Sequence, residues 1–390
     1  MTAIGNRKAN RIGIDFTSAL TQGAGIGRYT RELVREVVAT NQNDTFALFS
    51  ARQPAELPVP EPIPVAPNVS YHEAPISERW LYRLWYRLQL PVRVEWFTGR
   101  LDLFHSPDFV LPPVNDAIPT LLTVHDLSYL HFPETFTPAL VNYLNKVVPR
   151  SVGRASHILA DSEATRRDIV ERYNVPVERI TVLYSGVGER FKPVNNEARL
   201  RRVREKYGIG KRPYILSVST LQPRKNYEML IRAFKDIVAT RPHNLVIAGG
   251  KGWLYERVTE EIRLQGLNDR VLLIGFADDE DLPALYSGAS LFAYPSLYEG
   301  FGLPLLEAMA CGVPVLNSNA SCLPEVAGKA TRQLPPDDQA AWTQAMNSLL
   351  ADSGQRSRMV AAGFLQARKF TWTRAAQALN EIYHRLLSEK

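Results

Sequence analysis

Short apolar runs alternate with helical patterns along the whole chain, and this alternation limits the possible folds more than any other feature. Such a chain builds parallel sheets with helices on both faces, because each parallel strand pair needs a crossover connection. The expected strands of the first half are residues 11–15, 45–49, 101–105, 120–124, 157–160 and 180–183. Those of the second half are 214–218, 245–248, 271–274, 290–294 and 313–316. The predicted fold class is α/β.

Chain length and one polar stretch indicate two domains. The 390 residues exceed one ordinary doubly wound domain and suit two. Between Phe191 and Pro213 the sequence is polar and rich in Arg and Lys, and a new strand begins directly afterwards. We therefore expect the domain boundary in this stretch. Residues 54–67 are dense in proline and indicate an irregular surface connection.

Composition excludes several classes of protein. The formal net charge is +6 and the pI is near 9.2, and the aromatic residues are not arranged as in RNA-binding sheets, so nucleic acid is not the expected partner. Anionic small molecules or anionic lipid head groups fit the charge better. The two cysteines, Cys311 and Cys322, lack metal-ligand spacing. Neither a signal peptide nor a run of roughly 20 apolar residues is evident, so we expect a cytoplasmic protein.

The segment from Glu299 to Gly312, E-G-F-G-L-P-L-L-E-A-M-A-C-G, reads as a glycine-rich loop followed by a helix over 305–311. Pro304 suits a first helical turn, and Gly312 suits the left-handed residue after the last turn. Such a loop lies at the carboxyl end of a strand, where ligands bind, and the opening N–H groups favour anions. Glu299 at the strand end and Glu307 in the first helical turn would flank a bound phosphate. Glu307 could equally serve only the helix dipole.

This spacing of two glutamates resembles the E-x7-E signature of the retaining glycosyltransferases called family GT4. The resemblance implies the GT-B fold, two Rossmann-like doubly wound domains that face each other across a cleft. It implies an acceptor domain over 1–195, a nucleotide-sugar donor domain over 212–370, and a terminal helix over 371–390 that crosses back to the first domain. In this family the first glutamate holds the transferred sugar and the second binds the ribose. The resemblance therefore implies a sugar contact for Glu299 and a ribose contact for Glu307. The backbone between them binds the diphosphate, a role that the resemblance implies for Phe301, Gly302 and Leu303.

Three further motifs have places in the same family. Thr123-Val-His-Asp126 ends an apolar strand; His125 is either a structural hydrogen-bonding group or, as the family position implies, a catalytic residue near the sugar. Arg224 and Lys225 precede a helix expected over 226–240 and suit a diphosphate, although a solvated basic turn explains them too. Lys225 matches the family lysine. Many relatives have an arginine five or six residues before this lysine, where this chain has Ser219 and Thr220. Either Arg224 replaces that arginine, or the second cation comes from elsewhere.

The third motif, residues 22–28, is glycine-rich but fails the dinucleotide fingerprint, because it reads G-x-G-x-G and no acidic residue follows the next strand. It is either a loop that caps the following helix or, as the resemblance implies, a diphosphate contact through Gly25. The resemblance covers nearly the whole chain. It implies neither a cofactor nor a metal.

The implied reaction moves a hexose from a nucleotide-diphosphate sugar, with GDP-mannose favoured, to a glycan or polyprenyl-linked acceptor in surface polysaccharide synthesis. A UDP-sugar-dependent GT4 transferase and a non-catalytic sugar-nucleotide-binding protein are the alternatives. A glycoside hydrolase with Glu299 and Glu307 as paired carboxylates is a further one, but a helix N-terminus between them favours a phosphate.

Residues 78–100 indicate peripheral contact with the inner face of a membrane. Trp80, Leu81, Leu84, Trp85 and Leu88 recur at helical spacing between the arginines 79, 83, 87, 93 and 100. A basic helix with tryptophans lies in the head-group region of anionic lipid. The other interpretation is a core helix whose apolar stripe packs on the first sheet.

Overall fold

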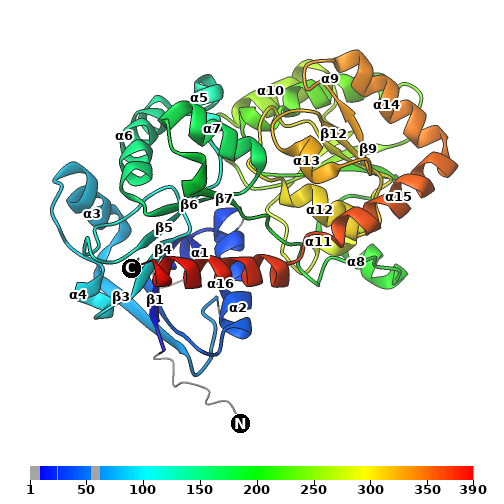
Figure 1. Ribbon diagram of the computed structural model, residues 1–390. Coiled ribbons are helices and arrows are strands. Elements are labelled where there is room, and N and C mark those ends of the chain that lie inside the picture. The colour runs from blue at the N-terminus through cyan, green and yellow to red at the C-terminus, as the bar shows by residue number, and fades with distance from the viewer. Residues whose placement is uncertain (1–8, 24, 54–61, 390) are drawn as a thin grey trace, which may run out of the picture. The chain divides into compact units, whose positions relative to one another are not determined.

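The computed structural model describes residues 9–23, 25–53 and 62–389 and contains two parallel sheets covered by helices (Figure 1). Contacts divide the chain into two compact units. The first unit comprises Met1–Leu127, Asn142–Gly186 and Trp372–Lys390, and the second comprises Ser128–Val141 and Val187–Thr371. The predicted α/β class with two doubly wound sheets is confirmed.

The first unit contains a seven-stranded parallel sheet in the order β3-β2-β1-β4-β5-β6-β7. Its central strands are short and apolar, because both faces of a parallel sheet are covered by helices; Ile12 and Ile14 of β1, for example, are fully buried. The strands are β1 (Arg11–Asp15), β2 (Thr45–Arg52), β3 (Val69–Ser77), β4 (Leu103–Ser106), β5 (Thr120–Val124), β6 (His157–Ala160) and β7 (Ile180–Val182).

The helices of this unit include the last helix of the chain. They are α1 (Thr17–Thr21), α2 (Ile26–Thr40), α3 (Glu78–Tyr82), α4 (Glu95–Thr98), most of α6 (Pro138–Arg154), α7 (Glu163–Tyr173) and α16 (Trp372–Ser388). Helix α16 lies along α2, where Thr373 Oγ1 donates a hydrogen bond to Glu36 Oε1 (2.6 Å). Behind this contact, Tyr383 and His105 share a buried hydrogen bond of 2.7 Å between the phenol and Nδ1.

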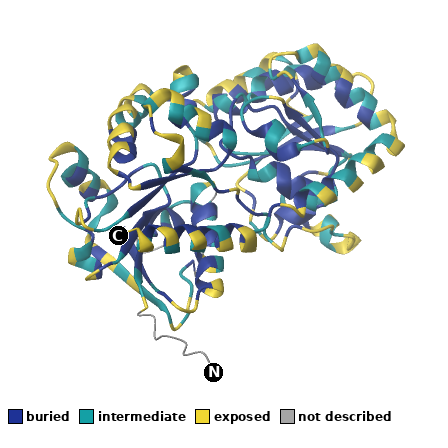
Figure 2. Cartoon of the chain, in the orientation of Figure 1, coloured by how far each residue is buried: buried dark blue, intermediate teal, exposed yellow. Residues whose placement is uncertain are grey.

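The second unit contains a six-stranded parallel sheet in the order β10-β9-β8-β11-β12-β13. Its strands are β8 (Tyr214–Val218), β9 (Asn244–Ala248), β10 (Val271–Gly275), β11 (Leu291–Tyr294), β12 (Val315–Ser318) and β13 (Arg332–Leu334). The helices are α5 (Ser128–His131), α8 (Glu197–Lys206), α9 (Tyr227–Val238), α10 (Glu256–Leu264), α11 (Leu282–Ser287), α12 (Leu303–Ala310), α13 (Leu323–Ala327), α14 (Gln339–Ala351) and α15 (Ser353–Ala367). In Figure 2 the central strands are buried and the outer helix faces are exposed, while the edge strands β3 and β10 are partly exposed.

The two sheets share one topological feature that determines where ligands bind. In each, the chain builds strands outward in one direction and then returns to the other side of its first strand, so the order reverses between β1 and β4 and between β8 and β11. Crevices form outside the carboxyl ends of the strands at such a reversal. Each unit therefore has one topologically defined binding position, which we call its switch point.

Sequence and structure differ in a few elements. Strands β3 and β13 were not predicted. The helical spacing predicted over residues 80–88 corresponds to α3 followed by one π turn (Arg83–Arg87), and the segment up to residue 100 is not one helix, because helix resumes only in α4. Asn226 precedes α9 but makes no capping bond; it has φ = 59° and its side chain donates to the carbonyls of Pro295 and Pro336. Of the proline-dense connection, residues 54–61 lie outside the described residues.

Among the described residues, every helix is either too short or too polar to cross a lipid bilayer.

Candidate active site

Two cations and a carboxylate meet at the switch point of the second unit. After β8 the chain makes one 3₁₀ turn, Pro223–Lys225, and after β11 it reaches Glu299. Lys225 Nζ donates to Glu299 Oε1 at 2.6 Å, and Arg224 Nη1 donates to Oε2 at 3.2 Å. Arg224 Nη1 also donates to the carbonyl of Tyr298. The structure thus brings Glu299 together with two residues that lie 75 and 74 positions before it in the sequence.

The electrostatics of this cluster favour an anionic ligand. Burial alone would raise the pKa of Glu299, but the charges of Lys225 and Arg224 outweigh burial and lower the pKa to about 2. Glu299 is therefore ionised at neutral pH, and the cluster holds two positive charges against one negative charge. A diphosphate can exchange hydrogen bonds with both cations, and guanidinium and ammonium groups are the side chains that bind phosphate best.

The loop after Glu299 is shaped by Gly302, which precedes α12. Gly302 has φ = 91°, a conformation that favours glycine, and a Cβ at this position would come within 2.8 Å of Leu323 Cδ2, so the Leu323 side chain would have to shift. Helix α12 then starts at Leu303 with Pro304 in its first turn, as expected, and Gly312 follows its end with φ = 76°. The loop residues Phe301 to Leu303 open the helix.

Glu307 lies differently from the prediction. Because α12 begins two residues earlier than expected, Glu307 is its fifth residue and not part of the first turn. Its carboxylate is buried, and Oε2 accepts a hydrogen bond of 2.8 Å from the phenol of Tyr286 in α11. The interpretation of Glu307 as a group that serves the helix dipole is therefore wrong, since that effect is confined to the first turn.

His125 lies in the first unit, directly after β5. Strands β5 and β6 pair Val124 with Ala160, so the next residues, His125 and Asp161, emerge side by side. His125 Nδ1 is 2.8 Å from Asp161 Oδ2, and Nε2 is 3.1 Å from the carbonyl oxygen of Pro107. Burial lowers the pKa of His125, but the carboxylates of Asp161 and Asp108 and these hydrogen bonds outweigh it and raise the pKa to about 9.

The protonated imidazole donates to both neighbours, so His125 is a hydrogen-bond donor and not a general base at neutral pH. These contacts are those expected of a structural hydrogen-bonding histidine. To contact a sugar, Nε2 would have to give up its hydrogen bond to the Pro107 carbonyl. Sequence analysis did not identify Asp161 as the partner of His125. The signal was available, because both residues directly follow neighbouring strands.

The glycine-rich loop of the first unit ends at Gly25, the N-cap residue of α2, with φ = 58°. A Cβ at Gly25 would meet no atom of the described residues within 4 Å, whereas a Cβ at Gly27 would lie 2.0 Å from the carbonyl oxygen of Gln22. Space therefore requires glycine at position 27, which the sequence did not single out. Arg31 holds the loop, donating to the carbonyls of Ala19, Gln22 and Gly23 at 2.7–2.8 Å. Helix α2 also places the Tyr29 ring edge-on to His125, with centroids 4.9 Å apart.

Comparisons with known proteins agree with this architecture. The family model "Glycosyltransferase Family 4" matches residues 23–190, and "Glycosyl transferases group 1" matches residues 201–366. The chain is similar to the Escherichia coli O-antigen chain mannosyltransferase B, with 33% identity over 89% of this chain and 92% of the relative. It is also 33% identical to the Escherichia coli serotype-specific mannosyltransferase WbdA over 73% of this chain, which spans 36% of that longer relative.

Solved structures show the same fold at low identity. Sucrose-phosphate synthase from Thermosynechococcus elongatus superimposes with a TM-score of 0.77 at 20% identity and covers 98% of this chain and 100% of its own. WaaG, a glycosyltransferase involved in lipopolysaccharide biosynthesis, has a TM-score of 0.71 at 16% identity over 95% and 99% of the two chains. The family matches and the relative aligned over nearly its full length show that this chain belongs to the family 4 glycosyltransferases and is a glycosyltransferase with two GT-B-type sheets.

Proposed function

We propose that the chain transfers a mannosyl residue from GDP-mannose to a glycan or polyprenyl-linked acceptor of a surface polysaccharide, with retention of anomeric configuration. The observation that carries this proposal is the buried cluster of Arg224, Lys225 and Glu299 at the switch point of the second unit. It combines the cations that a sugar diphosphate needs with a carboxylate fit to orient a sugar. Mannose is favoured because the relatives at 33% identity are named as mannosyltransferases.

The predicted site residues receive the following roles in this proposal. Lys225 and Arg224 stabilise the charge that develops on the departing diphosphate, and the N–H groups between Phe301 and Leu303 bind its oxygens. Glu299 and His125 orient the sugar, and Glu307, held by Tyr286, binds the ribose. Gly25 lets the backbone of the first unit approach the diphosphate.

Retention follows if the diphosphate acts as the base. The bond from the anomeric carbon to the diphosphate oxygen breaks, and the acceptor oxygen bonds to the same carbon from the same face. The acceptor proton passes to the departing phosphate oxygen, so no protein carboxylate has to act as nucleophile. Because two protein cations and a helix N-terminus already face the leaving charge, we expect transfer without a divalent metal.

The experiment is a panel of sugar nucleotides, with release of nucleoside diphosphate as the readout, in EDTA and in manganese. We expect the fastest release from GDP-mannose, undiminished by EDTA. Replacing Lys225 with Met should lower the rate by about 100-fold, the usual scale for one such electrostatic contact. The control, Lys211→Met at an exposed position, should leave the rate of nucleoside diphosphate release unchanged.

Each alternative predicts a different result. Fastest release from a UDP-sugar would favour the other donor class, which is represented among the similar folds by a structure of Anabaena HepE with UDP and glucose (18% identity, TM-score 0.71, 96% of this chain and 99% of that chain). No release from any donor would indicate a non-catalytic binding protein. Activity restored only by manganese would contradict metal independence.

We also propose that the first unit contacts an anionic membrane, where a polyprenyl-linked acceptor would lie. The predicted apolar stripe is divided: Leu81 and Trp85 are buried, whereas Trp80 and Leu88 are 55% and 59% exposed. Trp96 in α4 is 66% exposed, and α3 and α4 pack on the same edge strand, β3. The exposed arginines 79, 87 and 100 lie along this segment. Exposed tryptophans among arginines match the head-group region of anionic lipid.

A further inference from the structure

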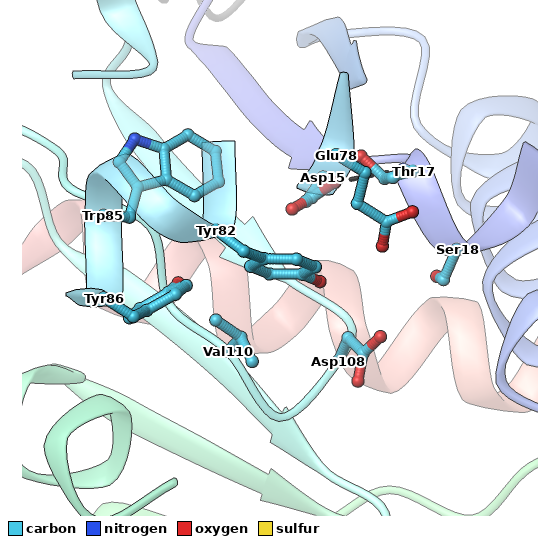
Figure 3. A pocket seen from close by; sticks show the side chains of 9 residues that line it. All are labelled: Asp15, Thr17, Ser18, Glu78, Tyr82, Trp85, Tyr86, Asp108 and Val110. Carbon is cyan, nitrogen blue, oxygen red and sulfur yellow. Dashed lines mark hydrogen bonds between the residues drawn. The ribbon is translucent and has the colours of Figure 1, made fainter. Parts of the chain in front are cut away.

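The pocket at the switch point of the first unit is too small for a ligand. The groups that line this first-unit pocket include three carboxylates and a phenol, those of Asp15, Glu78, Asp108 and Tyr82 (Figure 3). Its space holds about one water molecule, far less than a sugar or a nucleotide needs. The second unit differs, because an aromatic segment packs against the loops that supply its charged cluster.

This segment, Ser128–Val141, departs from the first unit and later rejoins it. It follows β5 and His125 in the sequence, and Asn142 belongs to the first unit again, yet its own contacts place it in the second unit. The segment contains α5, one 3₁₀ turn (Pro133–Thr135) and the first residues of α6. Ordering such a detour costs conformational entropy, so favourable contacts with the second unit have to offset that cost. We call these residues the docked segment.

The first contact of the docked segment reaches the residue next to Glu299. The imidazole of His131 stacks on the ring of Tyr298, with ring centroids 5.0 Å apart and an angle of 18° between the planes. Phe132 approaches the same tyrosine ring at 6.3 Å. The carbonyl oxygen of Tyr298 accepts the hydrogen bond from Arg224 Nη1. Tyr298 therefore links the docked segment to both sides of the charged cluster.

The second contact reaches the loop after β9. Trp253 Nε1 donates a hydrogen bond of 2.6 Å to the carbonyl oxygen of Thr135, and the rings of Trp253 and Phe136 lie 5.3 Å apart. The loop of Trp253 is joined in turn to the loop after β8, because the backbone of Leu221 exchanges hydrogen bonds of 2.9 and 3.0 Å with two glycines of the former. Leu221 leads into the turn that carries Lys225.

The docked segment thus packs against both loops that supply the cluster. Within the cluster, the N–H of Leu297 donates to the carbonyl oxygen of Arg224 (2.9 Å), and the N–H of Glu299 donates to Ser321 Oγ (2.8 Å). Loops hold side chains less precisely than helices and strands do. A displacement of about 1 Å in a reacting group can cost on the order of 100-fold in rate. Packing behind these loops is therefore a means of keeping the cluster in place.

Burial separates this role from a direct contact with substrate. Tyr298 is only 7% exposed, so its ring is not a platform on which a nucleobase or a sugar can lie. Its aromatic face serves the packing of the protein itself. Any effect of the His131–Tyr298 stack on the reaction has to pass through the neighbours of Tyr298.

We propose that His131 is a positioning residue for sugar transfer: its ring holds Tyr298, and Tyr298 fixes the place of Glu299. The contact of Trp253 steadies the loop before Lys225 in the same way. The effect on transfer rests on the proposed function, whereas the support of the two loops by the docked segment does not.

Steady-state kinetics test the role of the ring. His131→Ala should lower kcat by about ten- to 100-fold and leave the KM for the acceptor unchanged, since Glu299 is displaced. His131→Phe keeps a flat ring against Tyr298 and should retain most of kcat. Glu134→Ala, at an exposed position of the docked segment, is the control and should behave as the parent does. An unchanged kcat in His131→Ala, or equal losses in the alanine and phenylalanine variants, would overturn the proposal.

A double-mutant cycle tests whether the effect passes through Glu299. Added to Glu299→Ala, His131→Ala should cause a much smaller loss of kcat than it causes alone, because the group that it positions is already absent. A purely structural role of His131 would instead give losses that multiply. That result would exclude positioning of Glu299.

Trp253→Phe tests the second contact and stays informative if His131→Ala fails to fold. It removes only the indole N–H that bonds to Thr135 and keeps a ring against Phe136. We expect kcat to fall by about two- to tenfold, the scale of one neutral hydrogen bond. Parental kcat in this variant would contradict the role of the second contact.

Hydrogen exchange tests the support of the loops without any reaction. His131→Ala should speed exchange at the backbone amides of Leu297 and Glu299 by about two- to tenfold, the scale of one aromatic pair, and His131→Phe should not. Unchanged exchange in His131→Ala would refute the support by the docked segment, even in an active enzyme. If the parent releases no nucleoside diphosphate from any donor, the proposed function fails, and the exchange result alone decides whether the docked segment holds the loop.

Discussion

The two glutamates of the second unit have different surroundings, and this difference separates their expected effects. Glu299 is held between two cations, whereas Glu307 accepts a hydrogen bond from a phenol. We expect Glu299→Ala to lower kcat by about 100-fold, because in the proposed site Glu299 would face the sugar that gains positive charge during transfer. Glu307→Ala should mainly raise the KM for the donor, by about tenfold or more, because the ribose contact proposed for Glu307 would be the same before and during the reaction.

Steady-state kinetics with varied donor measures both effects. Glu205→Ala, at an exposed position of α8, is the matched control and should leave both constants unchanged. Near-parental turnover of both site variants at saturating donor would mean that the assignment is wrong.

His125 should make the stability of the chain depend on pH. Its pKa is about 9 when folded and ordinarily 6.5, so the folded state holds this proton more tightly. The resulting stabilisation is fully present below pH 6.5 and is lost as the pH rises through 9. By linkage it amounts to at most about 3 kcal/mol.

Urea unfolding between pH 6 and pH 9.5 measures this loss. Asp161→Asn removes the main charge that raises the pKa, so this variant should show a flatter dependence. A parent stability that is constant over this range, or a loss of equal size in Asp161→Asn, would contradict the ion-pair assignment.

At the scale of elements, the start of α12 depends on one glycine. Alanine at position 302 would have to adopt φ near 91° and would meet Leu323. Left-handed backbone alone costs about 1–2 kcal/mol in an L-residue, and the collision adds to that cost. We expect Gly302→Ala to destabilise the second unit by about 2 kcal/mol or more, because backbone strain and overpacking both act. It should also weaken GDP binding.

Gly266→Ala is the matched control. Gly266 also has a positive φ, 66°, but within the described part of the chain a Cβ there would meet no atom within 4 Å. It should show the backbone cost alone, with unaltered GDP affinity in calorimetry. Equal effects of the two substitutions would show that the contact with Leu323 is unimportant.

The strands that the sequence predicted best are those buried on both faces. β1, β5, β6 and β8 have the expected bounds because a short apolar run between polar residues leaves little choice of register. β3 was missed because it is an edge strand with alternating polar residues and Pro75, which only an edge tolerates. The helical spacing of residues 80–88 did not reveal the π turn, and Pro91 separates that turn from α4.

The site was predictable only where its residues follow strands in recognisable motifs. Glu299, Lys225 and His125 stand at such ends, and the structure places each at the carboxyl edge of its sheet. The first-unit pocket was not predictable, because its acids come from three segments far apart in the sequence and no local spacing connects them. Topology, and not motif, brings them together.

At the scale of the whole molecule, membrane association is the property most open to test. We expect the chain to sediment with anionic vesicles at low salt and not with neutral ones. Changing Arg79, Arg83 and Arg87 to Gln should weaken this binding by about 100-fold, since each basic residue near the surface contributes about 1 kcal/mol.

A charge-matched variant of the second unit, Arg201, Arg202 and Lys211 to Gln, removes the same number of exposed or nearly exposed cations and should bind as the parent does. If both triple variants lose binding equally, net charge and not the segment over 79–96 attracts the vesicles. If the parent does not sediment with anionic vesicles, the membrane proposal fails.

The repeated strand order has a consequence for how such a chain can diversify. Both sheets acquire a ligand-binding edge from the path of the backbone, and the groups that give that edge its charge stand at or just beyond the strand ends. A substitution there changes what the edge recognises without disturbing the packed interior. One framework used twice can thus carry a cationic edge in one copy and an acidic edge in the other.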